Sequence, residues 1–350
     1  MIQVAASAPV AEHVSFSGKP RLPSALAVAA FAVAAAWFAT ALPLLTYTFT
    51  LAMFGLAHVL AELRYVDERF GPRIARVVRG QMFSLLALVV AGRASVIVHL
   101  VPSRVWQPAE LLIVAALALT AWPRLRSAGI FASSLALAVV LGLAAGAIWA
   151  PEATLLALAV AHNITPAGFL AERLRGAQRR RALCVCVALL AVAALIASGA
   201  PTRGLNALGW WKPGVSLLPS AGELKAHLGA YVPSAWRVSE WGIAFFSAAV
   251  FLQCLHYGAV LHVLPRLNAG ASCGRTTVGW PRWRIFIGCV AAASLLLFGG
   301  FVVSFSDARS LYSLAAAVHA WIEIPLLLLA LAPGAVRVDD QRLVRSPSIS

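Results

Sequence analysis

The sequence predicts an all-α, polytopic integral membrane helix bundle of about ten transmembrane helices, with both termini in the cytoplasm. Three observations support this fold class. The 350 residues are 61% hydrophobic and only 12% charged, which excludes an ordinary soluble domain. Apolar stretches of about 20 residues, long enough to cross a bilayer, recur along the whole chain. Arginines gather between these stretches, so the net charge of +15 reflects membrane orientation and does not indicate nucleic-acid binding.

A polar segment, residues 1–22, precedes the first apolar stretch and lacks a signal-peptide cleavage pattern, so we expect a cytoplasmic tail. The first apolar region, 24–63, is too long for one helix, and Pro43 should divide it because proline interrupts a helix. A single transmembrane domain, 23–332, is expected before a second tail, 333–350. Its spans should lie near 24–42, 44–63, 80–101, 109–122, 129–150, 152–172, 182–199, 241–263, 285–304 and 310–332.

The distribution of arginine supports this order of spans. With the N-terminus inside, most loop arginines fall in the cytoplasmic loops, which are 64–79, 123–128, 173–181 and 264–284. The opposite short loops contain Arg104 and Arg309. Because Lys and Arg favour the cytoplasmic side, we expect both chain ends inside, in a bacterial inner (cell) membrane.

One long external segment, 200–240, separates the seventh and eighth spans. It is rich in Pro and Gly and contains interfacial aromatic residues, namely Trp210, Trp211, Tyr231 and Trp236, with Trp241 just after it. Trp and Tyr favour the membrane interface, so we expect a cap that lies on the surface or re-enters the membrane. His227, within this segment, is expected to be a surface residue.

Four histidines lie inside apolar spans at a common depth. They are His58, His162, His256 and His319. Their four spans all run from outside to inside in the predicted topology. At about 1.5 Å of rise per residue, the four share a slab roughly 9 Å thick. An ionisable residue in hydrocarbon is costly and usually faces the bundle interior, so we expect all four to line one cavity, within about 10 Å of each other.

Two of these histidines carry a carboxylate one helical turn later. Glu62 follows His58 by four residues and Glu323 follows His319 by four, so each pair projects from one helical face. Such a set suits a non-haem iron centre, and zinc or manganese remain alternatives. Glu62 and Glu323 are candidate ligands or partners that orient the imidazoles, and Asn163 is a candidate for orienting a ligand or a substrate. The competing interpretation is that each histidine makes only an interhelical hydrogen bond.

Three further ionisable residues lie in or near the spans, and one of them, His262, is a candidate for this centre. His262 lies six residues after His256 at the cytoplasmic end of the span and is a candidate fifth ligand. His99 lies at the external end of a span of opposite direction and is expected to be interfacial. Arg93 lies within a span and must find a partner, most simply a structural ion pair.

The order of these histidines resembles that of the Brp/Blh-type membrane β-carotene dioxygenases. The matching stretches are GLAHVLAE (55–62), AVAHNITPAG (159–168), LHYGAVLH (255–262) and AVHAWIEIP (317–325). The resemblance, one of layout, implies an iron centre that acts on a lipophilic polyene, with His58, His162 and His256 as ligands and His262 as a candidate ligand. The sequence departs from the family where His256 and His262 stand six residues apart, since the family's pair stands four apart.

Three functions remain open on these residues. The first is a membrane metal oxidoreductase, with non-haem iron, whose lipid-soluble substrate enters laterally from the bilayer. The second is an electron-transfer protein that clamps haem between two histidines. The third is a proton-coupled carrier with a His/Glu relay at the midplane. No phosphate-binding glycine loop or Cys-x-x-Cys pair is present, and no nucleic-acid partner is expected.

Overall fold

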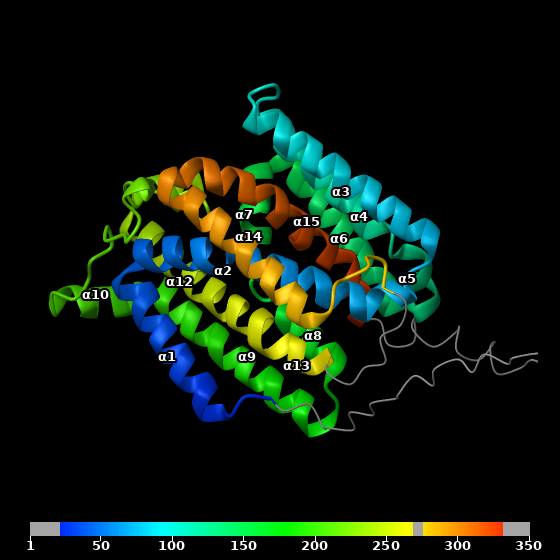
Figure 1. Ribbon diagram of the computed structural model, residues 1–350, viewed down its shortest axis with the longest axis horizontal. Coiled ribbons are helices and arrows are strands. Elements are labelled where there is room, and N and C mark those ends of the chain that lie inside the picture. Colours follow the sequence, from blue (N-terminus) through cyan, green and yellow to red (C-terminus); the bar gives the residue numbers. More distant parts are fainter. Residues whose placement is uncertain (1–21, 269–275, 332–350) are drawn as a thin grey trace, which may run out of the picture.

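The computed structural model describes residues 22–268 and 276–331, and within these ranges all regular structure is helical (Figure 1). The all-helical fold class is therefore confirmed. Of the two expected tails, 333–350 lies outside the described residues, and 1–22 overlaps them only at Leu22.

Within the described ranges, seven helical runs are long and apolar enough to cross a membrane. They are α2 (Pro43–Phe70), α3 (Arg76–Ile97), α6 (Ile130–Trp149), α9 (Gly176–Ala197), the continuous run Glu240–Leu267, α14 (Trp283–Val303) and α15 (Phe305–Leu331). Two bent pairs raise the number to nine, and these are α4 (Ser103–Leu119) with α5 (Trp122–Ala128) and α7 (Pro151–His162) with α8 (Thr165–Arg173). The remaining expected span is α1 (Ala25–Ala41), which at 17 residues is shorter. The count of ten therefore stays a prediction.

Proline and capping residues set several of these boundaries. The expected break at Pro43 is observed, since α1 ends at Ala41 and Pro43 begins α2. Proline suits the first turn of a helix because its missing N–H would have no partner there. Ser239 caps α12 (Glu240–Gly258), where its side chain accepts a hydrogen bond from the Gly242 N–H. A π-helical stretch, Ala259–Val263, and α13 (Leu264–Asn268) continue this run.

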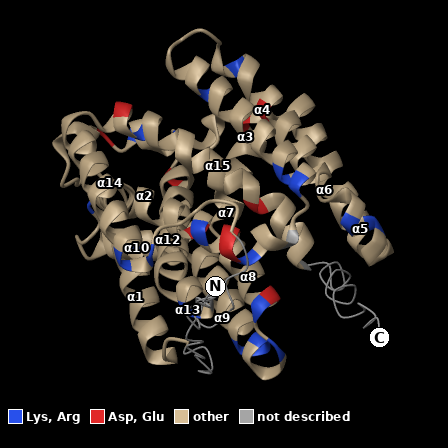
Figure 2. Ribbon diagram, turned by 45° about the vertical axis from the view of Figure 1, so that its right-hand side comes forward, with Lys and Arg blue, Asp and Glu red and all other residues tan. Residues whose placement is uncertain are grey.

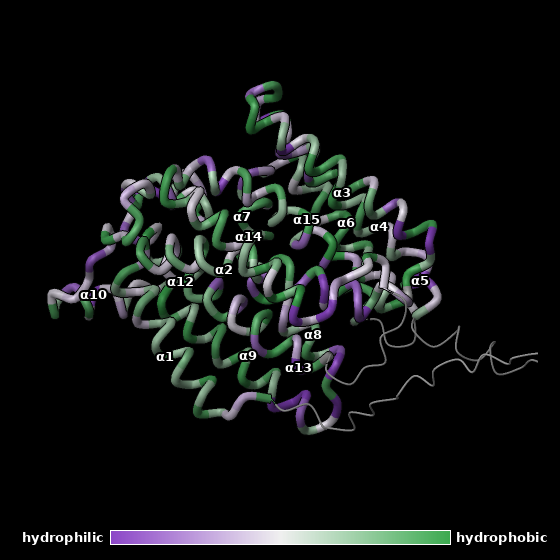
Figure 3. Tube along the Cα trace, in the orientation of Figure 1, coloured by the Kyte–Doolittle hydropathy of each residue, from purple (hydrophilic) through white to green (hydrophobic). Residues whose placement is uncertain are grey.

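The predicted cytoplasmic loops meet at one end of the bundle. Asp67, at the end of α2, accepts hydrogen bonds from the backbone N–H groups of Thr277 and Val278. Arg69 pairs with Glu172, at the end of α8. Figure 2 shows Lys and Arg at α5 and at the start of α9, and in Figure 3 hydrophilic residues concentrate at helix ends and connections. Which side of a membrane this end faces stays a prediction.

Segment 200–240 packs at the opposite end. It contains α10 (Ala200–Ala207), α11 (Lys225–Leu228) and two short 3₁₀ turns, Pro219–Ala221 and Ser234–Trp236. Three contacts anchor it to the bundle. The backbone N–H of Lys212 donates to the carbonyl of Ala41 in α1, and Arg237 forms an ion pair with Glu152 in α7. The hydroxyl of Ser220 donates to the carbonyl of Phe301 in α14.

The expectation of a surface position for His227 is wrong. Only 3% of this residue is exposed, because segment 200–240 folds inward and places the imidazole against Tyr47 and Phe305. Its Nε2–H donates to the carbonyl of Ala221 at 2.7 Å. The segment is thus a packed cap whose interior includes this histidine.

The most buried helices occupy the middle of the bundle. In the run Glu240–Leu267, 72% of the apolar window is buried, and in α2 the fraction is 50%, against 11% in α9 and in α14. Helices α9 and α14 therefore present most of their apolar surface outward, as expected for contact with lipid. Helix α2 contacts both α12 and α15, so residues of these three helices can converge (Figure 1).

Candidate metal centre

The four histidines of the membrane spans meet at one point. Helices α2, α7, α12 and α15 each contribute one, and one ligand nitrogen from each lies within 4.8 Å of the other three. His58, His256 and His319 are buried, and His162 is half-buried. The expected convergence is therefore observed, and it is tighter than the common depth alone required.

A break in the sixth predicted span places His162 at the end of its helix. In a continuous helix the N–H of residue 166 would donate to the carbonyl of His162, but Pro166 has no N–H. The hydroxyl of Thr165 donates to that carbonyl instead, at 2.8 Å. The chain bends by 44° between α7 and α8, so His162 is the last residue of α7.

Two of the imidazoles have their Nδ1 protons committed to other acceptors. The Nδ1–H of His58 donates to the carbonyl of Phe54 at 3.2 Å, and that of His162 donates to the carboxylate of Glu323 at 2.8 Å. These partners fix the neutral tautomer, so the Nε2 atoms of both rings carry lone pairs.

Both lone pairs point toward the same atom of a third ring. The Nε2 of His319 lies 3.2 Å from Nε2 of His58 and 3.0 Å from Nε2 of His162. A single proton on His319 can satisfy only one of these two acceptors. The arrangement therefore leaves lone pairs directed into one small volume, which a cation would satisfy.

The spacing of the three nitrogens fits one metal ion. Metal–nitrogen bonds of about 2.0–2.1 Å place two ligand nitrogens about 3.0 Å apart at a right angle and about 3.4 Å apart at the tetrahedral angle. The separations of 3.2 and 3.0 Å from Nε2 of His319 to its two neighbours fall within this range. The Nε2 atoms of His58, His162 and His319 are therefore close enough to bind one ion.

The two carboxylates are buried in the same place and are paired crosswise. Glu323, on α15, accepts from His162 of α7, and Oε2 of Glu62, on α2, lies 3.3 Å from Nε2 of His256 on α12. Each carboxylate therefore faces the histidine of a neighbouring helix. Such carboxylate–histidine contacts orient the ligands in metal sites.

Several polar atoms of this group have no hydrogen-bond partner among the described residues. They are both oxygens of Glu62, Oε1 of Glu323, both ring nitrogens of His256 and Nδ1 of His319. An unsatisfied buried polar group costs about 1–3 kcal/mol, and more when it is charged. The donor set of imidazoles and carboxylates therefore fits a divalent cation, which would partner several of these atoms at once.

Aromatic side chains that the sequence interpretation missed enclose the centre. The ring of Tyr257 stacks on His58, with centroids 4.0 Å apart. Tyr312 packs where Gly55 leaves room, since a Cβ at Gly55 would lie 3.2 Å from that ring. Tyr312 precedes His319 by seven residues, a spacing of two helical turns that could have revealed it.

A cavity of about 600 Å³ connects this centre with the capped end of the bundle. His58, His162 and His319 line one part of it, and residues of the cap such as Gly229 and Tyr231 line another. Asn163 also lines the cavity, and its amide donates to the carbonyl of Ala159 at 3.0 Å.

Three other sequence candidates lie away from the centre. His262 is exposed and lies within the π-helical stretch, outside the four-histidine group. His99 is exposed at the end of α3. Arg93 has the ion-pair partner it was expected to need, since its guanidinium lies 2.7 Å from Glu110.

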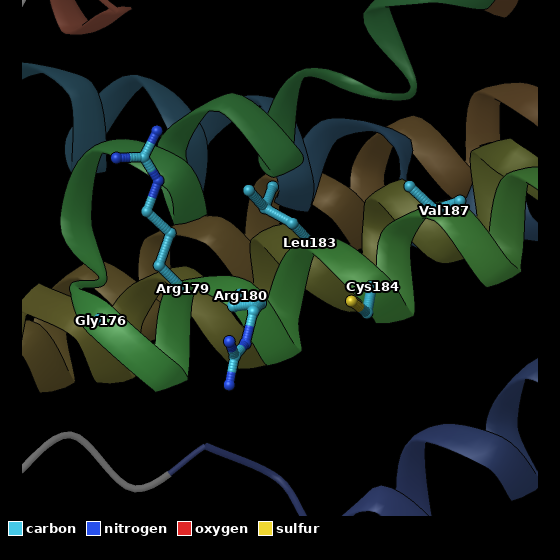
Figure 4. Close-up of a pocket in the computed structure, with 6 residues that line it drawn as sticks. All are labelled: Gly176, Arg179, Arg180, Leu183, Cys184 and Val187. Atoms are coloured by element: carbon cyan, nitrogen blue, oxygen red, sulfur yellow. The ribbon is translucent and has the colours of Figure 1, made fainter.

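A second hollow lies on the outer face of α9, and it lacks the features of a functional site. All six residues that line it belong to this one helix, and its polar side chains there are those of Arg179, Arg180 and Cys184 (Figure 4).

Comparisons of the chain with protein-family models, with curated proteins and with solved structures find no match.

Proposed function

We propose that this chain is an integral-membrane, metal-dependent oxidoreductase that holds non-haem iron and acts on a lipophilic substrate. The observation that carries the proposal is the convergence of His58, His162 and His319 through their Nε2 atoms. Carboxylates lie beside the rings of His162 and His256. The resemblance to the Brp/Blh-type β-carotene dioxygenases accords with this function. A bacterial inner membrane is part of the same proposal.

The residues divide into ligands and orienting groups. His58, His162, His256 and His319 would hold the metal, and a non-haem iron ion in such a set supplies one-electron and dioxygen chemistry. Glu323 holds the ring of His162 through Nδ1 and so fixes which nitrogen faces the centre. Tyr257 covers one face of the His58 ring and keeps water from it.

The cavity supports a lipophilic substrate. Its wall next to the centre is largely aliphatic, with Leu51, Leu155, Leu156, Ala316 and Ala320 among the lining residues. Removing the apolar surface of a hydrocarbon chain from water is favourable by about 25 cal/mol per Å², which would stabilise such a chain in this cavity. Ligand cavities typically combine apolar walls with placed polar groups, and this one adds Asn163, Gln253 and three arginines to its aliphatic wall.

The geometry disfavours the haem alternative. A haem held between two histidines places their Nε2 atoms on opposite sides of the porphyrin plane, at about 2.0 Å from the iron on each side, hence about 4 Å apart. Here Nε2 of His319 lies 3.0 and 3.2 Å from its two neighbours, and the ring of His256 is 4.5 Å from that of His162. The remaining imidazoles fill the space that the porphyrin would need.

Metal analysis and a visible spectrum of the detergent-purified protein test the proposal, beside a His58→Ala/His162→Ala double variant. We expect stoichiometric iron without a Soret band, and loss of the iron from the double variant. A Soret band would replace the proposal with the haem function. Absence of bound metal, even after purified protein is loaded with Fe²⁺ under anaerobic conditions, would favour the carrier, for which the broken helix at His162 is the supporting observation.

A further inference from the structure

The cavity beside the four-histidine centre has a defined direction. His58, His162 and His319 line its inner part, while Ala226, Gly229 and Arg237 of the cap line the other end. Arg309 and Ser310, from the first turns of α15, lie at that same end. A ligand can therefore extend from the capped end of the bundle to the histidines.

Three guanidinium groups line this cavity, and two of them are neutralised. Arg93 pairs with the buried carboxylate of Glu110 at 2.7 Å, and Arg237 pairs with Glu152 at 2.6 Å. Arg309, which is half-buried, forms no ion pair with any carboxylate in the described part of the chain. Of the three guanidinium groups that line the cavity, that of Arg309 is therefore the one without a paired carboxylate among residues 22–268 and 276–331.

The polar neighbours of Arg309, which are His227 and Tyr47, do not compensate its charge. The Nη1 group of Arg309 lies 3.5 Å from Nδ1 of His227, a long hydrogen bond. Because Nε2 of His227 donates to Ala221, Nδ1 is the acceptor of a neutral ring. Burial lowers the pKa of His227, and the charge of Arg309 lowers it further, which keeps this imidazole neutral.

The position of Arg309 sets the length of the ligand. Arg309 and His319 belong to one helix and are ten residues apart, which corresponds to about 15 Å. Between them the cavity wall includes Tyr312 and Ser313 and, nearer His319, the small apolar side chains of Ala316 and Ala317. The two alanines leave room for a hydrocarbon chain next to the histidines.

We infer that the ligand of this cavity is a long-chain carboxylate, an acidic amphiphile whose head group pairs with Arg309 and whose hydrocarbon chain extends to the four-histidine centre. Arginine matches a carboxylate through two parallel N–H donors, and a partly desolvated cation favours an anionic partner. The inference names the substrate class of the proposed oxidoreductase and rests on it for the reaction, although the binding step requires no metal.

Equilibrium binding of radiolabelled palmitate and of hexadecanol to the full-length protein in lipid nanodiscs tests this inference, with empty nanodiscs as the background. Both probes have the same chain, and only palmitate carries the charge. We expect palmitate to bind at least about tenfold more tightly than hexadecanol, as a charge-assisted contact provides. Octanoate should bind more weakly than palmitate because it cannot span the cavity. Equal affinity for palmitate and hexadecanol, or tighter binding of hexadecanol, would overturn the inference in favour of a neutral lipid.

Variants of the guanidinium locate the head group. Arg309→Gln should lose the preference for palmitate, while Arg309→Lys should retain part of it. Arg104→Gln is the matched control, since Arg104 is exposed at the start of α4 and does not line the cavity. A preference that survives Arg309→Gln in folded protein would place the head group elsewhere and refute the assignment. If Arg309→Gln does not fold, Arg309→Lys decides the question. A partly reduced preference for palmitate in that variant supports the assignment, and an unchanged preference refutes it.

The same assay separates this inference from the proposed function. The His58→Ala/His162→Ala variant should still prefer palmitate, because Arg309 is remote from the ligands on α15. If the protein never binds metal but still prefers palmitate, the carboxylate site stands and the proposed oxidoreductase function fails. If it binds stoichiometric iron but does not prefer palmitate, the oxidoreductase function stands and the carboxylate site fails.

Discussion

Replacing Glu323 by Gln isolates the charge that orients His162. The carboxylate accepts from His162 Nδ1 at 2.8 Å and is fully buried. Glutamine has the same shape and its carbonyl can still accept this hydrogen bond, so the ring keeps its position but loses the negative charge behind it. Loss of such an orienting partner typically weakens metal binding about 10- to 100-fold, or about 1.4–2.7 kcal/mol.

The assay is a competition titration of metal-depleted protein with Zn²⁺ against a chelator of known affinity. Glu110→Gln is the matched control, because Glu110 is also a buried carboxylate but bonds to Arg93, Trp106 and Trp321, away from the four histidines. It should keep the metal affinity and lose about 1–3 kcal/mol of folding stability, since it leaves a partly buried guanidinium without its partner.

In the absence of metal, Glu323→Gln should not destabilise the protein. The buried carboxyl groups of Glu62 and Glu323 are neighbours, so replacing that of Glu323 by an amide removes the cost of keeping an ionisable group buried beside Glu62. We therefore expect the thermal stability of the metal-free variant to equal or exceed that of wild type. Wild-type affinity for Zn²⁺ in folded Glu323→Gln would refute the role assigned to this carboxylate.

Two further predictions concern the packing around the centre and the cap. Gly55→Ala places a Cβ 3.2 Å from Tyr312 and should lower the free energy of unfolding by about 1 kcal/mol. Gly142→Ala, whose Cβ would meet no atom within 4 Å, should be neutral or stabilising. Equal stabilities of the two variants would show that the Tyr312 ring moves aside at no energetic cost. Because burial lowers the pKa of His227 in the folded protein, its unfolded state binds more protons below about pH 6.5, so hydrogen-exchange protection of the cap should fall as pH decreases through that value. His227→Gln should flatten this dependence, and an unchanged pH profile would mean that another group controls it.

The meeting of the four histidines could be predicted from the sequence, because their expected common depth follows from helical rise and the distribution of arginine. The four histidines are therefore found where their positions along the spans placed them. Rotation about each helix axis could not be predicted in the same way. The crosswise contacts of Glu62 with His256 and of Glu323 with His162 depend on which helices are neighbours, and a single sequence does not reveal that.

Local backbone irregularities account for other differences between expectation and structure. Proline interrupts a helix wherever it lies in the interior, but only the hydrogen bond from Thr165 to the carbonyl of His162 shows that the break at Pro166 orients a candidate ligand. The π-helical stretch after His256 changes the direction in which later residues point, so His262 is exposed. His227 is buried because α2 and α15 supply its neighbours, Tyr47 and Phe305, from distant parts of the chain.

The charge of the centre argues for a divalent cation over a proton relay. Two carboxylates, Glu62 and Glu323, lie within the most buried part of the bundle, and each has at least one oxygen without a hydrogen-bond partner among the described residues. A relay needs groups that hand protons along a path, whereas here the Nδ1 protons of His58 and His162 are held by fixed acceptors on the outer side of the ring cluster. The free lone pairs consequently face inward, toward His319. One doubly charged ion at that point would offset both carboxylates and bind the inward lone pairs. A proton shared by the two carboxyl groups would leave the lone pairs of His58 and His162 with a single N–H of His319 between them.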